Sequence, residues 1–209
     1  MPLQNRITPF GEILATPERG LLMGNRGGRF HDPGSRTLTR RRWANKAWII
    51  CVTSFKNRHR EVMGHSYTEL FFLDEVTALA AGHRPCFECQ RQKAKAYQAA
   101  WQEAFHLAEA PKVAIMDPQL HAERLSQRDK RLHQIAKSHL IDGVMVAHHG
   151  RAFAVKGDAL HAWQFDGYHR SALSLRDLPE RVSMITPPST RAILAEGYQP
   201  FWHPTIECA

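Results

Sequence analysis

The chain has 209 residues, of which 43% are hydrophobic and 23% are charged, a composition typical of a soluble folded protein with a sizeable core. No apolar run approaches the roughly 20 residues that a membrane-spanning helix needs, and the first twenty residues lack the basic start and apolar stretch of a secretory signal, so neither membrane insertion nor export is expected. We therefore expect a cytoplasmic protein whose four cysteines stay reduced or bind a metal.

The positive charge is concentrated in one tract. The net charge of the chain is +8. Residues 26–60 carry ten Lys or Arg against the single acid Asp32, so this tract has a charge of +9 and the remaining residues are near neutral. Cations interleaved with aromatic rings are typical of a surface that binds DNA or RNA, although a solvated surface has a similar composition. The residues predicted to contact nucleic acid are Arg26, Arg29, Arg40, Arg41, Arg42, Lys46, Lys56, Arg58 and Arg60.

The first half of the chain shows short, well-delimited elements. Residues 24–46 are rich in Gly and Arg without a period, which predicts a loop or a mobile basic arm. Residues 47–54 and 69–73 are apolar runs typical of strands. Asp74 lies where a helix N-cap belongs, and Gly82 is the expected left-handed residue that ends this helix.

The second half mixes helices with hairpins. Ala94, Tyr97, Trp101 and Phe105 predict a long helix, and residues 119–137 predict a highly charged one. From Gly143 the pattern alternates, with glycines at 150 and 157 as hairpin turns, and residues 182–185 predict another strand. A last helix opens at Thr186-Pro187 and ends at Gly197.

Cys86 and Cys89 form the most informative motif. A Cys-x-x-Cys pair directly before a helix places two thiolates within reach of one ion, at a helix end that favours negative charge. Because a structural zinc site has four ligands, we expect Cys51 as the third ligand. The fourth is expected to be His59, with His65 and His83 as alternatives, and Cys208 near the C-terminus is a further candidate. A redox pair or unliganded core thiols are the competing interpretations.

The stretch ELFFLDEVTALAAGHRPCFECQR, residues 69–91, resembles the second half of the zinc domain of Ada-type DNA repair proteins. The resemblance covers 23 of the 209 residues and includes a strand, a capped helix that ends in Ala-Ala-Gly, and an Arg-Pro-Cys-x-x-Cys turn. It implies that Cys86 and Cys89 are zinc ligands.

The upstream part departs from that family. The family has a Cys-x-x-x-Cys pair there, one member of which accepts a methyl group from a DNA phosphotriester. Counted back without gaps, these positions are Phe55 and His59 here. The resemblance therefore implies a zinc module on nucleic acid rather than methyl transfer, with His59 as a substitute ligand.

A second pattern overlaps the same residues. His59-x-Glu61 followed by Pro85-Cys86-x-x-Cys89 is the signature of zinc-dependent nucleobase deaminases, in which Glu61 would move the proton between water and the leaving amine. The residues before Pro85 read as a helix and its glycine end, whereas that fold requires a strand there. We therefore keep the deaminase as the alternative function.

We predict an α+β protein: a small zinc-centred strand and helix module, followed by a helix and a hairpin-rich C-terminal region. A weak boundary at Pro111 divides residues 1–110, an Ada-like zinc-binding domain with a basic N-terminal arm, from residues 111–209. The predicted function is zinc and nucleic-acid binding. A zinc-stabilised fold that binds a small molecule or a protein is a further possibility.

Overall fold

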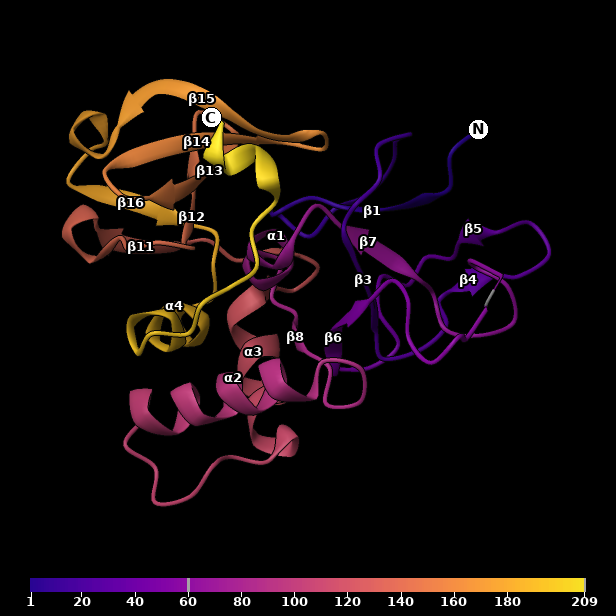
Figure 1. The fold of residues 1–209 in the computed structure, drawn as a ribbon. Helices are drawn as coiled ribbons and strands as arrows, with labels where there is room; N and C mark the ends of the chain where they lie inside the picture. The colour runs from indigo at the N-terminus through magenta and orange to yellow at the C-terminus, as the bar shows by residue number, and fades with distance from the viewer. Residues whose placement is uncertain (60, 209) are drawn as a thin grey trace.

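The computed structural model describes residues 1–59 and 61–208, and it contains two six-stranded sheets with helices between and beneath them (Figure 1). The N-terminal sheet has the strand order β2-β1-β7-β3-β6-β8 and is mixed, because β1 pairs with β7, and β6 with β8, in parallel. Its strands are β1 (Gln4–Ile7), β2 (Ile13–Ala15), β3 (Leu22–Arg26), β6 (Trp48–Val52), β7 (Leu70–Phe72) and β8 (Arg84–Pro85). The predicted α+β fold is confirmed.

Local signals place β6, β7 and the helix that follows them. The two strands lie within the predicted ranges 47–54 and 69–73, and α1 covers Glu75–Ala80. The Asp74 side chain accepts a hydrogen bond from the backbone N–H of Thr77 at 2.8 Å, which is the expected N-cap. Gly82 has a φ of +87° and ends the helix as predicted.

The expectation of a loop over residues 24–46 is wrong in two places. Residues 24–26 belong to β3, which lies inside the sheet between β7 and β6. Residues 31–38 form a small hairpin of β4 (His31–Asp32) and β5 (Thr37–Leu38). Gly24 is required in β3 because a Cβ there would lie 2.1 Å from the Ile49 carbonyl oxygen, so the glycine marks close strand packing rather than a turn.

Two of the three later helices agree with the sequence. α2 covers Arg91–Ala104 and buries the predicted face, and α4 covers Pro188–Ala195 before Gly197 at φ +85°. The helix expected at 119–137 is wrong, because α3 covers Val113–Arg124 and includes Pro118. The chain then becomes extended at Leu125 and forms a hairpin of β9 (Leu125–Ser126) and β10 (Asp129–Lys130).

The C-terminal sheet is antiparallel, with the order β11-β16-β12-β13-β14-β15. Its strands are β11 (His133–Ala136), β12 (Met145–His148), β13 (Arg151–Lys156), β14 (Ala159–Gln164), β15 (Gly167–Ser174) and β16 (Arg181–Met184). Gly150 and Gly157 have positive φ at hairpin turns, and β16 covers most of the expected strand 182–185, so both predictions are confirmed.

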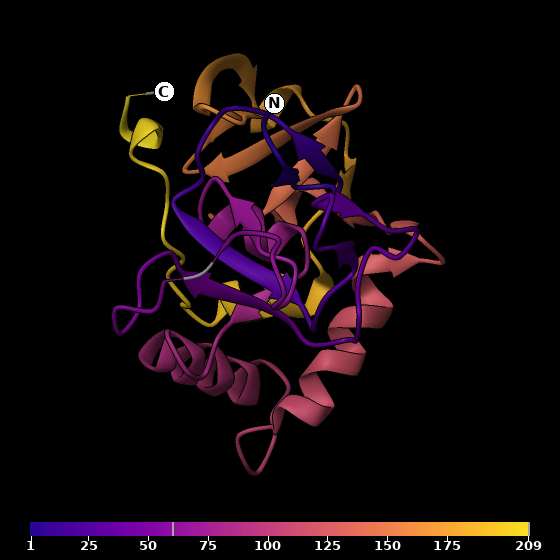
Figure 2. The same ribbon diagram turned by 90° about the vertical axis from the view of Figure 1, so that its right-hand side faces the viewer.

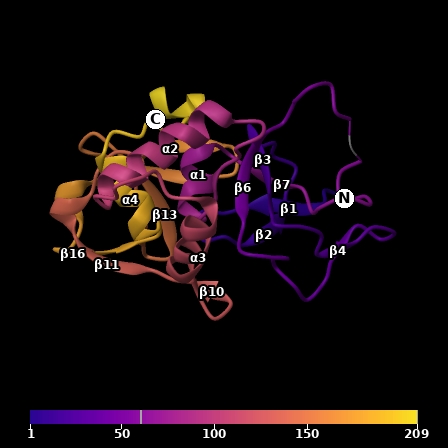
Figure 3. The same cartoon turned by 90° about the horizontal axis from the view of Figure 1, so that it is seen from below.

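The two sheets lie on opposite sides of α1 and α3 (Figures 1 and 3), and α2 and α3 lie below both sheets (Figure 2). One hydrophobic cluster includes Ile50 and Leu79 from the first half and Val146 and Phe153 from the second, so the core is continuous across the predicted boundary near residue 110. Within the described chain, none of the helices combines the length and apolar character needed to cross a bilayer.

Candidate functional site

Three thiols meet at the edge of the N-terminal sheet. Cys51 lies in β6, and β8 runs parallel to β6 so that Pro85 aligns with Ile50. The backbone N–H of Cys86 donates to the Ile50 carbonyl at 2.9 Å, which continues this alignment and sets Cys86 beside Cys51. The turn before α2 adds Cys89, and the three Sγ atoms lie within 4.8 Å of one another. The group could therefore hold a metal ion.

The chemistry of the cluster suits a soft divalent metal. With Zn–S bonds of about 2.3 Å, a tetrahedral site spaces its sulfurs by about 4 Å, which fits the observed grouping. Hydrogen bonds from the Cys51 and Cys89 thiols lower the pKa of Cys86, whereas donation to Cys86 and burial raise the pKa of Cys51. Three thiolates this close repel one another, so their joint ionisation requires a cation between them.

The histidines proposed as fourth ligand lie elsewhere. His59 and His65 are exposed, and His83 is fully buried, with its ring 5.0 Å from Trp48 and 4.7 Å from Phe72. His83 Nε2 accepts a hydrogen bond from Arg26 Nε at 3.4 Å. Among residues 1–59 and 61–208, no His, Asp or Glu and no further Cys joins the three thiols, so the fourth ligand stays a prediction.

A cavity of about 200 Å³ adjoins the thiols, and all three cysteines contribute to its wall. Strand register explains its composition: Met23 pairs with both Cys51 and Phe71, so these three side chains share one face of the sheet. Asn25 lies two residues after Met23 on β3 and therefore on the same face. Glu69, which immediately precedes β7 and lies two residues before Phe71, is on this face as well. Glu69 is only 1% exposed.

Glu69, and not the Glu61 of the deaminase pattern, lines the cavity of the thiols. The Glu61 carboxylate is exposed, pairs with Arg36, and does not line the cavity of the thiols. Glu69 Oε2 accepts from the backbone N–H of Met63 at 2.8 Å, whereas Oε1 has no hydrogen-bond donor in the described structure. The sequence offers one indication that Glu69 lies on this face. Side chains two positions apart in a strand point the same way, so Glu69 shares the face of Phe71 if the strand extends to residue 69.

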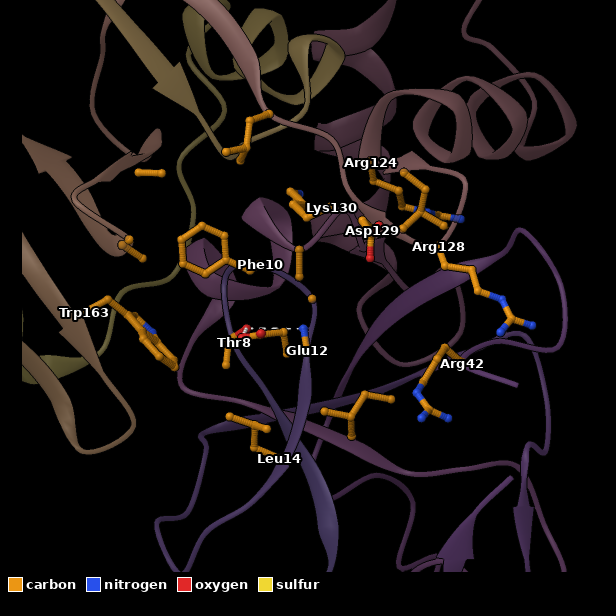
Figure 4. A pocket seen from close by; sticks show the side chains of 18 of the residues that line it. Thr8, Phe10, Glu12, Leu14, Arg42, Arg124, Arg128, Asp129, Lys130 and Trp163 are labelled. Carbon is orange, nitrogen blue, oxygen red and sulfur yellow. Dashed lines mark hydrogen bonds between the residues drawn. The ribbon is translucent and has the colours of Figure 1, made fainter. Parts of the chain in front are cut away.

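The opposite face of the same strands borders a larger cleft of about 1180 Å³ (Figure 4). Alternation along β3 and β6 directs Arg26 and Trp48 into this cleft, and Asn25, Ile49 and Cys51 into the smaller cavity. The other walls come from the β1–β2 hairpin, the end of α3, the β9–β10 hairpin and the C-terminal sheet. The cationic side chains that line the cleft are Arg26, Arg42, Arg124, Arg128, Lys130 and Arg151.

Two buried guanidinium groups stack on Trp48. The Cζ atoms of Arg26 and Arg124 lie 3.9 and 3.8 Å from the ring centroid, and both residues are at most 2% exposed. Burial is the larger and repulsion from Arg42 the smaller cause that lowers the pKa of Arg26. For Arg124, burial is again the largest cause of a lowered pKa, and repulsion from Arg26 is the next. Arg124 donates to the carbonyls of Gly82 and Lys46, both at 2.7 Å, whereas its Nε has no acceptor in the described structure.

The predicted basic tract is divided among several surfaces. Arg26 and Arg42 line the cleft, whereas Arg40, Arg41 and Lys46 are exposed outside its lining. The others lie elsewhere. Arg29 donates to the His65 carbonyl at 3.1 Å. Lys56 and Arg58 lie over the ring of Phe55, near the thiol cavity. Arg60 lies outside the described residues.

Four of the six cleft cations lie outside the predicted basic tract: Arg124, Arg128, Lys130 and Arg151. They come from segments read as a helix and a hairpin, and only the packing of the two sheets brings them opposite the tract. Comparisons of the chain with protein-family models, with curated proteins and with solved structures gave no match.

Proposed function

We propose that this chain is a zinc-binding protein that binds nucleic acid in the cleft between its two sheets. The observation that supports the second part is the charge of the cleft. Six cationic side chains line it against the two carboxylates of Glu12 and Asp129, an excess of four formal positive charges. None of the six forms an ion pair with a carboxylate among the described residues.

Cations without carboxylate partners favour an anionic ligand. Arg26 and Arg124 are already held at the back of the cleft by contacts to Trp48 and to backbone carbonyls. Figure 4 shows Arg42 and Arg128 extending to the same side of the opening from different segments. A phosphate between these two groups would offset their repulsion, and a second phosphate would offset the desolvation of the inner pair.

Aromatic rings line the same cleft and favour single strands. Four rings besides Trp48 contribute to the walls: Phe10, Trp43, Trp163 and Phe165. Stacking on such rings requires bases whose faces are free, which a duplex does not offer because neighbouring base pairs cover them. We therefore expect tighter binding of single-stranded oligonucleotides than of duplexes of the same length.

The salt dependence of oligonucleotide binding tests this part. If Arg42, Arg128, Lys130 and Arg151 neutralise four phosphates, the plot of log affinity against log salt has a slope of about −3, and affinity falls roughly 50-fold between 50 and 200 mM salt. Fluorescence anisotropy of a labelled oligonucleotide measures both quantities. Affinity that does not change over this range contradicts phosphate binding.

A matched pair of variants locates the interface. Arg128 and Arg41 are both exposed arginines, but only Arg128 lines the cleft. We expect Arg128→Glu to weaken binding by about tenfold and to flatten the salt slope by about 0.7, while Arg41→Glu changes affinity by about twofold or less. Equal effects of the two variants would place the interface outside the cleft.

The metal is tested separately, by measuring bound zinc in the purified protein. Cys86 belongs to the thiol cluster, whereas Cys208 is exposed and outside it. We expect Cys86→Ser to lose the ion and Cys208→Ser to retain it. Zinc binding that survives Cys86→Ser contradicts the assigned site.

A further inference from the structure

The thiol cavity and the basic cleft lie on opposite faces of one sheet, so they present two separate ligand sites. The side chains of Cys51 and Ile49 point to one face of β6, and those of Trp48 and Ile50 to the other. A polymer bound in the cleft therefore does not reach the thiols through the sheet, and any ligand of the thiol cavity is a separate molecule.

The thiol cluster borders this cavity. Three thiols are grouped, and the part of the chain that the structure describes supplies no fourth His, Cys, Asp or Glu. A zinc ion held by three protein ligands keeps one position for water or for a bound molecule. Because Cys51, Cys86 and Cys89 all line the cavity, a molecule in the cavity would lie beside that position.

The cavity walls select a small and largely apolar molecule. The apolar lining consists of Met23, Ile49, Val52, Phe55, Val62 and Phe71. A volume of about 200 Å³ is below the range of drug-sized pockets, so it suits a molecule of roughly ten non-hydrogen atoms or fewer. Flat rings pack well against the side chains of Ile49 and Phe71, which share this face of the sheet.

Glu69 supplies the polar contact. It is 1% exposed, one of its oxygens is satisfied by the Met63 N–H, and the other has no donor in the described structure. A buried acceptor without a donor costs free energy, and the cost is larger for a charged group. A ligand that brings an N–H to Oε1 removes this cost, whereas an anionic ligand would be repelled.

We propose that the cavity binds a small nitrogen heterocycle, which coordinates the metal through a ring nitrogen and donates an N–H to Glu69. The proposal rests on the metal of the proposed function and is independent of nucleic-acid binding. Glu69 thereby becomes the residue that selects neutral hydrogen-bond donors over anions at the open position of the metal. Its neighbours in the sheet supply the apolar walls.

Cobalt substitution tests the open position. Zinc is spectroscopically silent, whereas Co²⁺ bound by thiolates absorbs in the visible range and reports each change in coordination. Imidazole, which has a ring nitrogen and an N–H, is the first probe, and azide, an anion without a donor, is the second. We expect saturable spectral shifts with imidazole, and no spectral change with either probe would show that a protein group closes the site.

Glu69→Gln tests the selectivity. We expect this variant to bind Co²⁺ as the unmodified protein does, to bind imidazole about tenfold more weakly, and to bind azide equally or more tightly. Glu88→Gln is the matched control, because Glu88 lines the same cavity but is exposed and pairs with Arg58 at 2.8 Å; its imidazole affinity should not change. Equal imidazole affinity in Glu69→Gln and the unmodified protein overturns the role of Glu69.

Failure of the metal site itself gives a different result. If Co²⁺ produces no thiolate absorption, or if the absorption survives in Cys86→Ser, the metal assignment of the proposed function is wrong. If the absorption is present, depends on Cys86 and ignores both probes, the metal assignment stands and the ligand site is wrong.

Discussion

The fully buried carboxylate of Glu75 joins the first half of the chain to the last, and Tyr198→Phe tests that link. Glu75 Oε1 accepts from the hydroxyl of Tyr198, and Oε2 accepts from Lys93 Nζ at 3.0 Å and from the backbone N–H of Phe201 at 2.7 Å. The variant removes one hydroxyl, keeps the ring in the core, and leaves one carboxylate oxygen without its donor.

The cost follows from the charge on the acceptor. A hydrogen bond to a charged group contributes about 1.5–3 kcal/mol, so we expect Tyr198→Phe to lower the free energy of unfolding by about 2 kcal/mol. For a chain of this size that shift lowers Tm by about 4–8 °C. Tyr97→Phe is the matched control, because the Tyr97 hydroxyl is buried but shares its hydrogen bond with the neutral Thr190 hydroxyl at 3.3 Å. Its expected cost is about 0.5–1 kcal/mol.

Urea unfolding measures these differences, and Glu75→Gln completes a double-mutant cycle. We expect a coupling energy of at least about 1 kcal/mol between positions 75 and 198. A single transition with an unchanged m-value is also expected, since the hydrophobic core runs through both halves. Equal costs for Tyr198→Phe and Tyr97→Phe, with additive energies in the cycle, would refute the role assigned to the carboxylate.

Two further predictions concern the sheet and its buried histidine. Gly24→Ala should destabilise the fold by about 2–3 kcal/mol in urea unfolding, because the new Cβ would lie 2.1 Å from the Ile49 carbonyl oxygen. Gly150→Ala is the control, since Gly150 has a φ of +74° in open space, and it should cost about 1 kcal/mol. A larger cost for Gly150→Ala than for Gly24→Ala would contradict the β3–β6 packing. Burial, followed by the charges of Arg26 and Arg124, lowers the pKa of His83 well below 6.5, so the unfolded chain takes up a proton first as the pH falls. Stability should therefore decrease below about pH 6.5 with a slope approaching 1.4 kcal/mol per pH unit for one proton, and a flat profile from pH 7.5 to 5.5 would refute this assignment.

Local chemistry explains the elements that were predicted well. The Asp74 cap, the left-handed Gly82, the alternating hairpins from Gly143 and the apolar face of α2 depend on contacts between residues a few positions apart. The Cys-x-x-Cys pair belongs to the same class, because its two sulfurs are brought together by a single turn. Such features are present in the sequence whatever the rest of the chain does.

The predicted secondary structure is wrong where a distant segment of the chain overrides a local preference. Gly24 and Arg26 resemble loop residues in sequence, but the pairing of β3 with β6 and β7 turns them into strand residues. Residues 125–137 continue the charged pattern of a helix, yet the chain leaves α3 at Leu125, and β11 pairs with β16 from the far end of the sequence. No local sequence pattern predicts pairing with a strand so far away in the chain.

From the sequence alone came a thiol pair suited to a metal, an excess of positive charge and an α+β composition. Only the tertiary structure decided that Glu69 rather than Glu61 lines the cavity of the thiols, that Arg124 and Arg128 line the same cleft as Arg42, and that thiol cavity and cleft lie on opposite faces of one sheet. The physical reason is that strand alternation assigns each side chain to a face, while strand register, which depends on residues far apart in the chain, determines which side chains meet there.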